Sequence, residues 1–140
     1  MALVVNLQRK IKLDTKRFSD FTADLSPAVT EIAGADFSIA FVSDRRMKEL
    51  NGFFRGKDVT TDVLSFPHEA DEFDTDSNLG DIVISVEQAQ KQAKENDLTL
   101  ENEIKQLILH GLLHLCRYDH ETDDGEMNKR ELELRRQLKI

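Results

Sequence analysis

The sequence predicts an α+β fold, in which helices pack on one small mixed sheet of four strands. Four short segments are rich in β-forming residues or alternate apolar and small residues, and five others repeat apolar residues at helical spacing. Their order along the chain is β-α-β-α-β-β-α-α-α. The length of 140 residues suits a single domain, residues 1–140, with one core.

The first three elements alternate between strand and helix. The segment "LVVNLQ" (residues 3–8) is rich in β-formers and predicts the first strand. Residues 14–34 repeat apolar residues at helical spacing as far as Gly34, and Pro27 either divides this helix or starts a second short one. The alternating segment "DFSIAFVS" (residues 36–43) predicts the second strand.

A short helix and a third strand follow. The helix "DRRMKELNGFFRG" can be capped by Ser43 or Asp44, and Met47 and Leu50 are expected to face inward. The strand "TDVLSF" is rich in β-formers and is expected to end at Pro67.

The second half of the chain predicts one strand and three helices. An acidic loop, residues 68–78, precedes the strand "LGDIVISV" and the helix "SVEQAQKQAKEND". The next helix, "TLENEIKQLILHGLLHLC" (residues 99–116), can be capped by Thr99 and is apolar nearly all round, which predicts that it is buried. The last helix, "DGEMNKRELELRRQLKI", is amphipathic, with three candidate inward residues, Met127, Leu134 and Leu138.

Composition excludes several classes of protein. The longest apolar stretch, "LILHGLLHLC", is too short to span a bilayer, and the N-terminus does not have the pattern of a signal peptide. One cysteine rules out an internal disulfide and fits a reducing cytosol, so we expect a cytoplasmic protein. The net charge of −8 argues against nonspecific nucleic-acid binding over the whole surface, although it leaves room for a local basic patch.

Three of the four histidines lie in "HGLLHLCRYDH", residues 110–120. His110 and His114 are four residues apart and therefore share one face of the predicted helix. If the chain turns back after the helix, His120 can join them. Three neutral imidazoles suit one zinc ion per chain, with the fourth position left for water. The sequence therefore predicts a metal site on a buried helix.

The spacing of these histidines is that of the metzincin peptidase signature H-E-x-x-H-x-x-G-x-x-H. Two positions differ, because Gly111 replaces the glutamate that acts as general base and Arg117 replaces the glycine of the turn. The missing glutamate argues against a peptidase. If residue 117 adopts left-handed backbone geometry, arginine there costs roughly 1–2 kcal/mol more than glycine.

Two further segments, "NGFFRGKDVTTDVLSFPHE" (residues 51–69) and "LGDIVIS" (residues 79–85), complete a pattern with the histidines. Together these segments resemble the YbeY family of bacterial ribosomal RNA maturation endoribonucleases. The resemblance runs in the same order over most of the chain. Thr60 and Arg117 depart from it, since the family often has proline and usually has glycine at these positions.

The resemblance implies a single zinc held by His110, His114 and His120. It also implies that Arg55 faces the site and is needed for RNA cleavage. A physical reason supports this assignment, because phosphodiester cleavage builds negative charge on the nonbridging oxygens, which a Lewis acid and a fixed cation stabilise. The planar guanidinium of Arg55 can bind a phosphate through two hydrogen bonds.

Other residues are weaker candidates. Asp119 can orient an imidazole or cap a turn, and Tyr118 can stack on a base or pack. Lys57 and Arg117, together with Arg45 and Arg46, can supply a local basic patch or be solvated surface charges. Three residues are expected to be structural: Asp62, His68 and Cys116.

The sequence thus predicts a zinc-dependent endoribonuclease specific for single-stranded RNA. The resemblance places it in ribosomal RNA maturation, at the 3′ end of 16S rRNA, and in ribosome quality control, with ribosomal RNA and ribosomal proteins as partners and neither DNA nor membrane. Two alternatives remain at this level. One is a non-catalytic ribosome-assembly factor with a structural zinc, and the other is a zinc-dependent hydrolase or peptidase.

Overall fold

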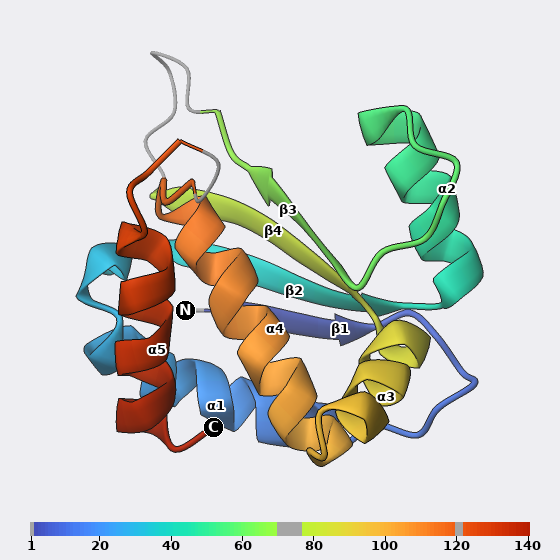
Figure 1. The fold of residues 1–140 in the computed structure, drawn as a ribbon, viewed down its shortest axis with the longest axis horizontal. Coiled ribbons are helices and arrows are strands. Elements are labelled where there is room, and N and C mark those ends of the chain that lie inside the picture. Colours follow the sequence, from blue (N-terminus) through green and yellow to red (C-terminus); the bar gives the residue numbers. More distant parts are fainter. Residues whose placement is uncertain (1, 70–76, 120–121) are drawn as a thin grey trace.

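The computed structural model describes residues 2–69, 77–119 and 122–140. Within these residues the chain forms four strands, five α-helices and one short 3₁₀ helix (Figure 1). In chain order they are β1 (Ala2–Asn6), α1 (Thr15–Ala28), η1 (Thr30–Ile32), β2 (Asp36–Val42), α2 (Asp44–Arg55), β3 (Val63–Pro67), β4 (Asn78–Ser85), α3 (Val86–Glu95), α4 (Leu100–Leu115) and α5 (Glu126–Leu138).

The four strands form one mixed sheet in the order β1-β2-β4-β3. β1 pairs with β2 and β2 with β4 in parallel, whereas β3 runs antiparallel to β4 at the edge. The predicted α+β fold and the predicted order of elements are therefore confirmed. Strand and helix ends differ from the predicted ones by only a few residues, as expected where hydrogen bonding rather than residue type decides the boundary.

Pro27 neither divides α1 nor begins a second α-helix. The helix passes through Pro27 and ends at Ala28, and the separate turn that follows, η1, is a 3₁₀ helix. Proline lacks the N–H that would bond the Ala23 carbonyl one turn earlier, and the helix ends one residue after it.

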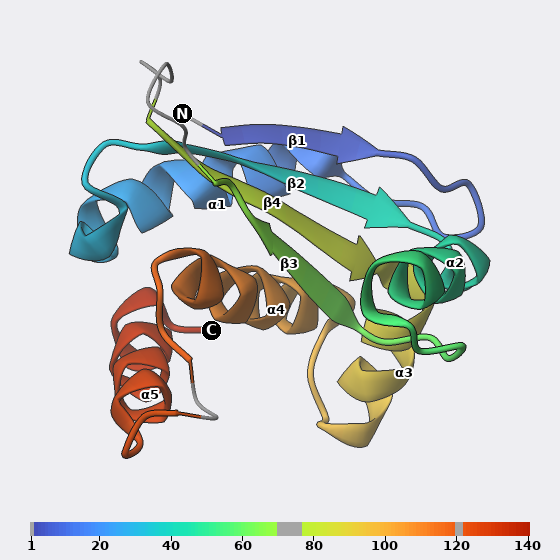
Figure 2. The same ribbon diagram turned by 90° about the horizontal axis from the view of Figure 1, so that it is seen from above.

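Alternation along the strands divides the apolar side chains between the two faces of the sheet. Ile82 and Ile84 of β4 belong to the main core beneath α1, α4 and α5, whereas Val83 joins a smaller cluster with Met47 of α2 and Leu64 of β3. Figures 1 and 2 show α4 running along the sheet and α2 away from α1, α4 and α5. The start of α2 contacts α3, where the Asp44 N–H donates to the Glu87 carboxylate at 3.1 Å. The same alternation turns Ser65 of β3 toward α4, where its hydroxyl donates to the Gly111 carbonyl at 3.2 Å.

The helix that carries the histidine pair is buried, as predicted. Thr99 caps it by accepting a hydrogen bond from the Asn102 N–H. Its apolar residues from Ile104 to Leu115 are fully or almost fully buried. Among the residues that the structure describes, no helix is both long and apolar enough to cross a membrane.

Gly111 is the point of closest approach between α4 and the sheet. A Cβ atom at this position would lie 2.9 Å from Cγ2 of Ile82 and 3.2 Å from Oγ of Ser65. Ile82 is fully buried and branched at Cβ, so it has little freedom to move away. A glutamate, the residue of the peptidase signature, has no room here unless the helix moves away from the sheet.

We therefore expect Gly111→Ala to destabilise the fold. Overpacking costs about 1–3 kcal/mol, and the better helix propensity of alanine returns at most about 1 kcal/mol. Gly52→Ala in α2 is the matched control, because the nearest atom to its Cβ would be the Lys57 carbonyl oxygen at an ordinary 3.7 Å. Urea unfolding should show a loss of stability for Gly111→Ala and a small gain for Gly52→Ala. Equal gains in both variants would contradict the close approach.

Candidate active site

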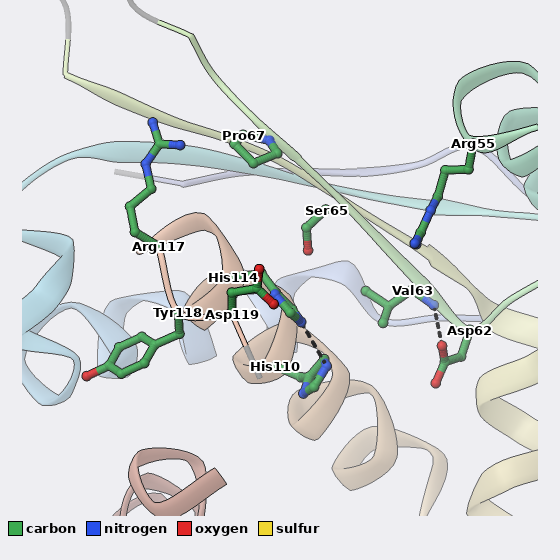
Figure 3. A pocket seen from close by; sticks show the side chains of 10 residues that line it. All are labelled: Arg55, Asp62, Val63, Ser65, Pro67, His110, His114, Arg117, Tyr118 and Asp119. Atoms are coloured by element: carbon green, nitrogen blue, oxygen red, sulfur yellow. Dashed lines mark hydrogen bonds between the residues drawn. The ribbon is translucent and has the colours of Figure 1, made fainter. Parts of the chain in front are cut away.

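A cavity of about 640 Å³ opens between β3, α4 and the segment that follows α4 (Figure 3). Most of the residues singled out from the sequence meet here, although they come from four separate parts of the chain. The lining residues are Arg55, Asp62, Val63, Ser65, Pro67, His110, His114, Arg117, Tyr118 and Asp119.

The predicted histidine pair lies on the cavity wall. Nε2 of His110 and Nε2 of His114 are 3.3 Å apart, and the two ring planes are 77° from parallel. Two nitrogens bound to one tetrahedral zinc at about 2.0–2.1 Å would lie about 3.4 Å apart. The distance between the two nitrogens therefore fits a shared metal ion. The third predicted ligand, His120, lies outside the described residues, which contain no group of three or more metal-binding side chains.

Glu131 of α5 holds His110 in this orientation. Its Oε1 lies 2.9 Å from Nδ1 of His110, and its side chain is almost fully buried. Arg135, one turn later, places a guanidinium nitrogen 3.6 Å from the same oxygen. A carboxylate on Nδ1 leaves the Nε2 lone pair of the imidazole available for a metal, which is the usual arrangement around histidine ligands.

Sequence reasoning missed Glu131, although a signal was present. The inward residues Met127, Leu134 and Leu138 define a stripe along the last helix, and Glu131 occupies the same stripe. A glutamate on an inward stripe needs a partner, because a buried charge without one is costly.

We expect Glu131→Gln to weaken zinc binding about 10- to 100-fold, because partners of ligating histidines contribute on this scale. Competition with a chromogenic chelator measures the affinity. Glu133→Gln is a control on the same helix, since Glu133 is half exposed and pairs with Arg130 rather than with His110. The same loss in both variants would show a general charge effect rather than a specific bond to His110.

The turn after α4 has left-handed backbone geometry at residue 117, where the related motifs have glycine. Arg117 has φ +76°, in the left-handed region. The Tyr118 N–H donates to the Leu113 carbonyl at 3.1 Å and the Arg117 N–H to the His114 carbonyl at 3.0 Å, the two bonds of a Schellman motif. Arginine instead of glycine at this position costs about 1–2 kcal/mol. Tyr118 and Asp119, which follow this turn, line the cavity.

Tyr118 is anchored away from the histidines. Its hydroxyl donates to the Glu31 carboxylate at 2.8 Å, and its ring packs against the main core. Arg130 binds the same carboxylate through two nitrogens, each at 2.8 Å. These hydrogen bonds, led by those from Arg130, lower the pKa of Glu31 from 4.5 to about 2. Packing, rather than base stacking, is thus the better supported of the two roles considered for Tyr118.

The Glu31 carboxylate should contribute stability that disappears in acid. Its pKa is lower in the folded chain, so the contribution is complete above about pH 4.5 and is lost as the pH falls toward about 2. We expect wild type to be more stable than Glu31→Gln at neutral pH and the gap to shrink below about pH 4.5. Urea unfolding over this pH range measures it. A gap independent of pH would mean that the charge of Glu31 is not responsible.

The two arginines of the cavity come from opposite ends of it (Figure 3). Arg55 is the last residue of α2, which ends because Gly56 adopts left-handed geometry. The Arg55 side chain extends toward Asp62 and Val63, where β3 begins. The Arg117 guanidinium points away from the histidines. Both are exposed, as is Lys57, which does not line the cavity.

Four remaining candidates have local roles in the structure. The Asp62 carboxylate accepts the Val63 N–H at 2.8 Å, which fits a turn-stabilising role. The Asp119 carbonyl accepts two N–H groups of the next turn, and its side chain lines the cavity. The His68 N–H donates to the Leu79 carbonyl beside the sheet. Cys116 packs against the main core, and burial raises its pKa to about 11, which makes it a poor metal ligand.

A second cavity of about 490 Å³ shares Asp62, Val63 and His110 with the first. Its other lining residues include the amides of Gln92 and Gln106. The site can therefore accommodate a ligand that is longer than one phosphate group.

Comparison with known proteins agrees with this arrangement. The family model described as endoribonuclease YbeY matches residues 3–139. A protein named endoribonuclease YbeY from Nautilia profundicola is 49% identical over 105 residues, which are 75% of this chain and 73% of that protein. Proteins of the same name from Thermodesulfovibrio yellowstonii and Aquifex aeolicus are 38% and 41% identical, over 90% and 94% of this chain and 87% and 85% of theirs.

The fold also has a counterpart among solved structures. The solution structure of TM1509 from Thermotoga maritima superposes with a TM-score of 0.70 at 29% identity, over 99% of this chain and 89% of that one. With the family model matching nearly the whole length, the chain belongs to the endoribonuclease YbeY family.

Proposed function

We propose that residues 1–140 form one zinc-dependent domain that cleaves single-stranded RNA during ribosomal RNA maturation, including the 3′ end of 16S rRNA, and in ribosome quality control. As a member of the endoribonuclease YbeY family, the chain is a hydrolase that acts on RNA. The observation that carries the proposal is the pair of imidazole nitrogens 3.3 Å apart, in a cavity that Arg55 also lines.

His110, His114 and His120 would hold the zinc. When bound, zinc supplies a Lewis acid next to the phosphate that is cleaved. Three neutral imidazoles leave its double positive charge intact, which suits an anionic substrate better than a site with an added carboxylate. The collision of any Cβ at position 111 with Ile82 keeps the peptidase glutamate out of this site.

The remaining groups position the metal ligands and the substrate. Glu131 orients His110 and favours its Nε2 lone pair toward the cavity. Arg55 binds two nonbridging oxygens of the phosphate through its planar guanidinium and stabilises the charge that grows there during cleavage. Asp119, Arg117 and Lys57 are further candidates for contact with RNA around the cavity.

The size of the cavity supports an enzyme rather than a structural zinc site. Structural zinc sites are closed by four protein ligands, whereas catalytic sites keep one position open. A space of about 640 Å³ in front of the histidine pair leaves room for a phosphate and a water molecule. We further propose that the protein works in the cytoplasm, on ribosomal RNA and beside ribosomal proteins. Its single cysteine supports that location, and its net charge of −8 speaks against general binding of DNA.

The test is cleavage of a single-stranded RNA by rigorously nuclease-free protein. We expect activity that a chelator abolishes and added zinc restores, with little cleavage of the same sequence in a duplex. Bound zinc without any cleavage would instead support the assembly-factor alternative. Cleavage that persists in zinc-free protein would contradict the proposed role of the metal.

A further inference from the structure

Two phenylalanines at the end of α2 are exposed. Phe53 is 83% exposed and Phe54 is 58% exposed. Four other phenylalanines are in the main core and are 6% exposed or less: Phe18, Phe21, Phe37 and Phe41. Phe53 and Phe54 therefore contribute little to the core and present a large part of their rings to solvent.

The exposed rings form a ladder that reaches β3 on the face of the sheet that α2 covers. The Phe53 and Phe54 ring centroids are 4.8 Å apart, and the Phe54 and Phe66 centroids are 5.1 Å apart, with steep angles between the planes in both pairs. Phe66 lies in β3 between Ser65 and Pro67, which line the cavity, but its side chain points to the opposite face of the sheet, where it packs with Leu64 and Val83. The link to the cavity is Arg55, which directly follows Phe54 in the chain and lines the cavity.

This part of an acidic protein is basic. Residues 44–58 contain five basic and three acidic side chains, whereas the whole chain has 19 basic and 27 acidic ones. Arg45, Arg46 and Lys48 pair with nearby carboxylates. Within the described parts of the chain, no ion pair involves Arg55 or Lys57, the two cations that directly follow the exposed rings.

We propose that Phe53 and Phe54 form a stacking platform for the bases of single-stranded RNA that extends from the cavity, while Arg55 and Lys57 bind its phosphates. The proposal rests on the proposed function, because it extends the path of the same substrate. Proteins that bind single strands combine cations along the backbone with aromatic rings on which bases stack. A platform of this kind accepts any base, but it requires the bases to be unpaired, so it favours single-stranded over duplex RNA.

A protein partner fits this surface less well. Two aromatic side chains bury at most about 150–250 Å² each, whereas a stable protein interface buries about 1,200–2,000 Å² in total. Arg55 and Lys57 beside the rings favour a polyanion, and Arg55 also lines the cavity that suits a phosphate.

The test measures binding of a fluorescent, nuclease-resistant single-stranded RNA of about twelve nucleotides, a length within the usual range for such sites. We expect Phe53→Ala to weaken binding about tenfold, Phe53→Leu nearly as much, and Phe53→Tyr to bind like wild type, because tyrosine keeps the ring. Leu7→Ala is the matched control, since Leu7 is 69% exposed and follows the opposite edge strand, β1. Its affinity should equal that of wild type.

A second probe, an RNA backbone without bases, separates stacking of bases on the rings from other contacts with the RNA. The same RNA backbone without bases should bind wild type more weakly and should not distinguish wild type from Phe53→Ala. If the backbone probe loses as much affinity in Phe53→Ala as the complete RNA does, the rings do not stack bases. Equal binding of complete RNA by wild type and Phe53→Ala would also overturn the platform.

Sedimentation velocity tests whether a second copy of the chain, rather than RNA, binds the exposed rings. A wild-type dimer that Phe53→Ala dissociates would assign the rings to a second copy of the chain and overturn the RNA proposal. Because the RNA probes are not cleaved, the platform and the proposed function fail separately. An inactive wild type that shows the expected pattern of binding would contradict only the proposed cleavage.

Discussion

Replacing Arg55 by alanine is expected to slow single-turnover cleavage of single-stranded RNA by a factor on the order of a hundred or more. Loss of one charge-stabilising group of this kind removes roughly 2.7–4 kcal/mol of transition-state stabilisation, and each 1.36 kcal/mol is about tenfold in rate. Arg55→Lys should be almost as slow, because lysine keeps the charge but loses the planar pair of donors.

Two further measurements distinguish a loss of phosphate binding from a loss of metal or of surface charge. Zinc content should be the same in all variants, since no metal ligand is changed. Arg45→Ala is the matched control, because Arg45 belongs to the same helix, is exposed and pairs with Glu49 instead of lining the cavity. Near-normal cleavage by Arg55→Ala would return Arg55 to the class of solvated surface arginines.

Removing the metal should produce the other large effect, on stability. A ligand that binds only the folded chain stabilises it by about 4 kcal/mol when present at a thousand times its Kd. For a chain of this size that amounts to about 10 °C in Tm. We expect a chelator to lower the Tm of wild type by this amount, and His114→Ala to have a low Tm that the chelator no longer changes.

His68→Ala is the control for this experiment, because His68 is the one histidine outside the predicted metal motif. It should keep both the zinc and the response to chelator. If the chelator shifts wild type and His114→Ala equally, the helix histidines are not the ligands. About one zinc per wild-type chain in elemental analysis would agree with the three-histidine site.

Much of the fold could be predicted because its signals are local. Cap residues such as Ser43 and Thr99 satisfy N–H groups only three residues away, and they start their helices where predicted. The period of apolar residues decides which side of a strand or helix is buried, so the burial of α4 and the inward Met127 and Leu134 were also predictable. Pro27 was harder to interpret, because proline is compatible with the first turn of a new helix as well as with a kinked or ending one.

The candidate site also has features that the sequence determined and features that it did not. Sequence alone determined that His110 and His114 share a helix face, because a spacing of four residues has that result in any α-helix. It also indicated left-handed geometry at residue 117, since the motif has a glycine there. Whether His120 completes the ligand set is still a prediction.

Only the tertiary structure decided which distant side chains complete the site. Glu131 is 21 residues from His110, and Ser65 is 46 residues from Gly111, yet both pairs are in hydrogen-bond contact. Such pairs depend on how α5 packs against α4 and how closely α4 approaches the sheet, which no local propensity encodes. Tertiary packing also decided that Gly111 leaves no room for a peptidase glutamate and that Phe53 and Phe54 stay in solvent beside Arg55. The physical reason is that the spacing of residues specifies each helix and strand separately, whereas contacts between them follow from the joint packing of all the side chains in the core.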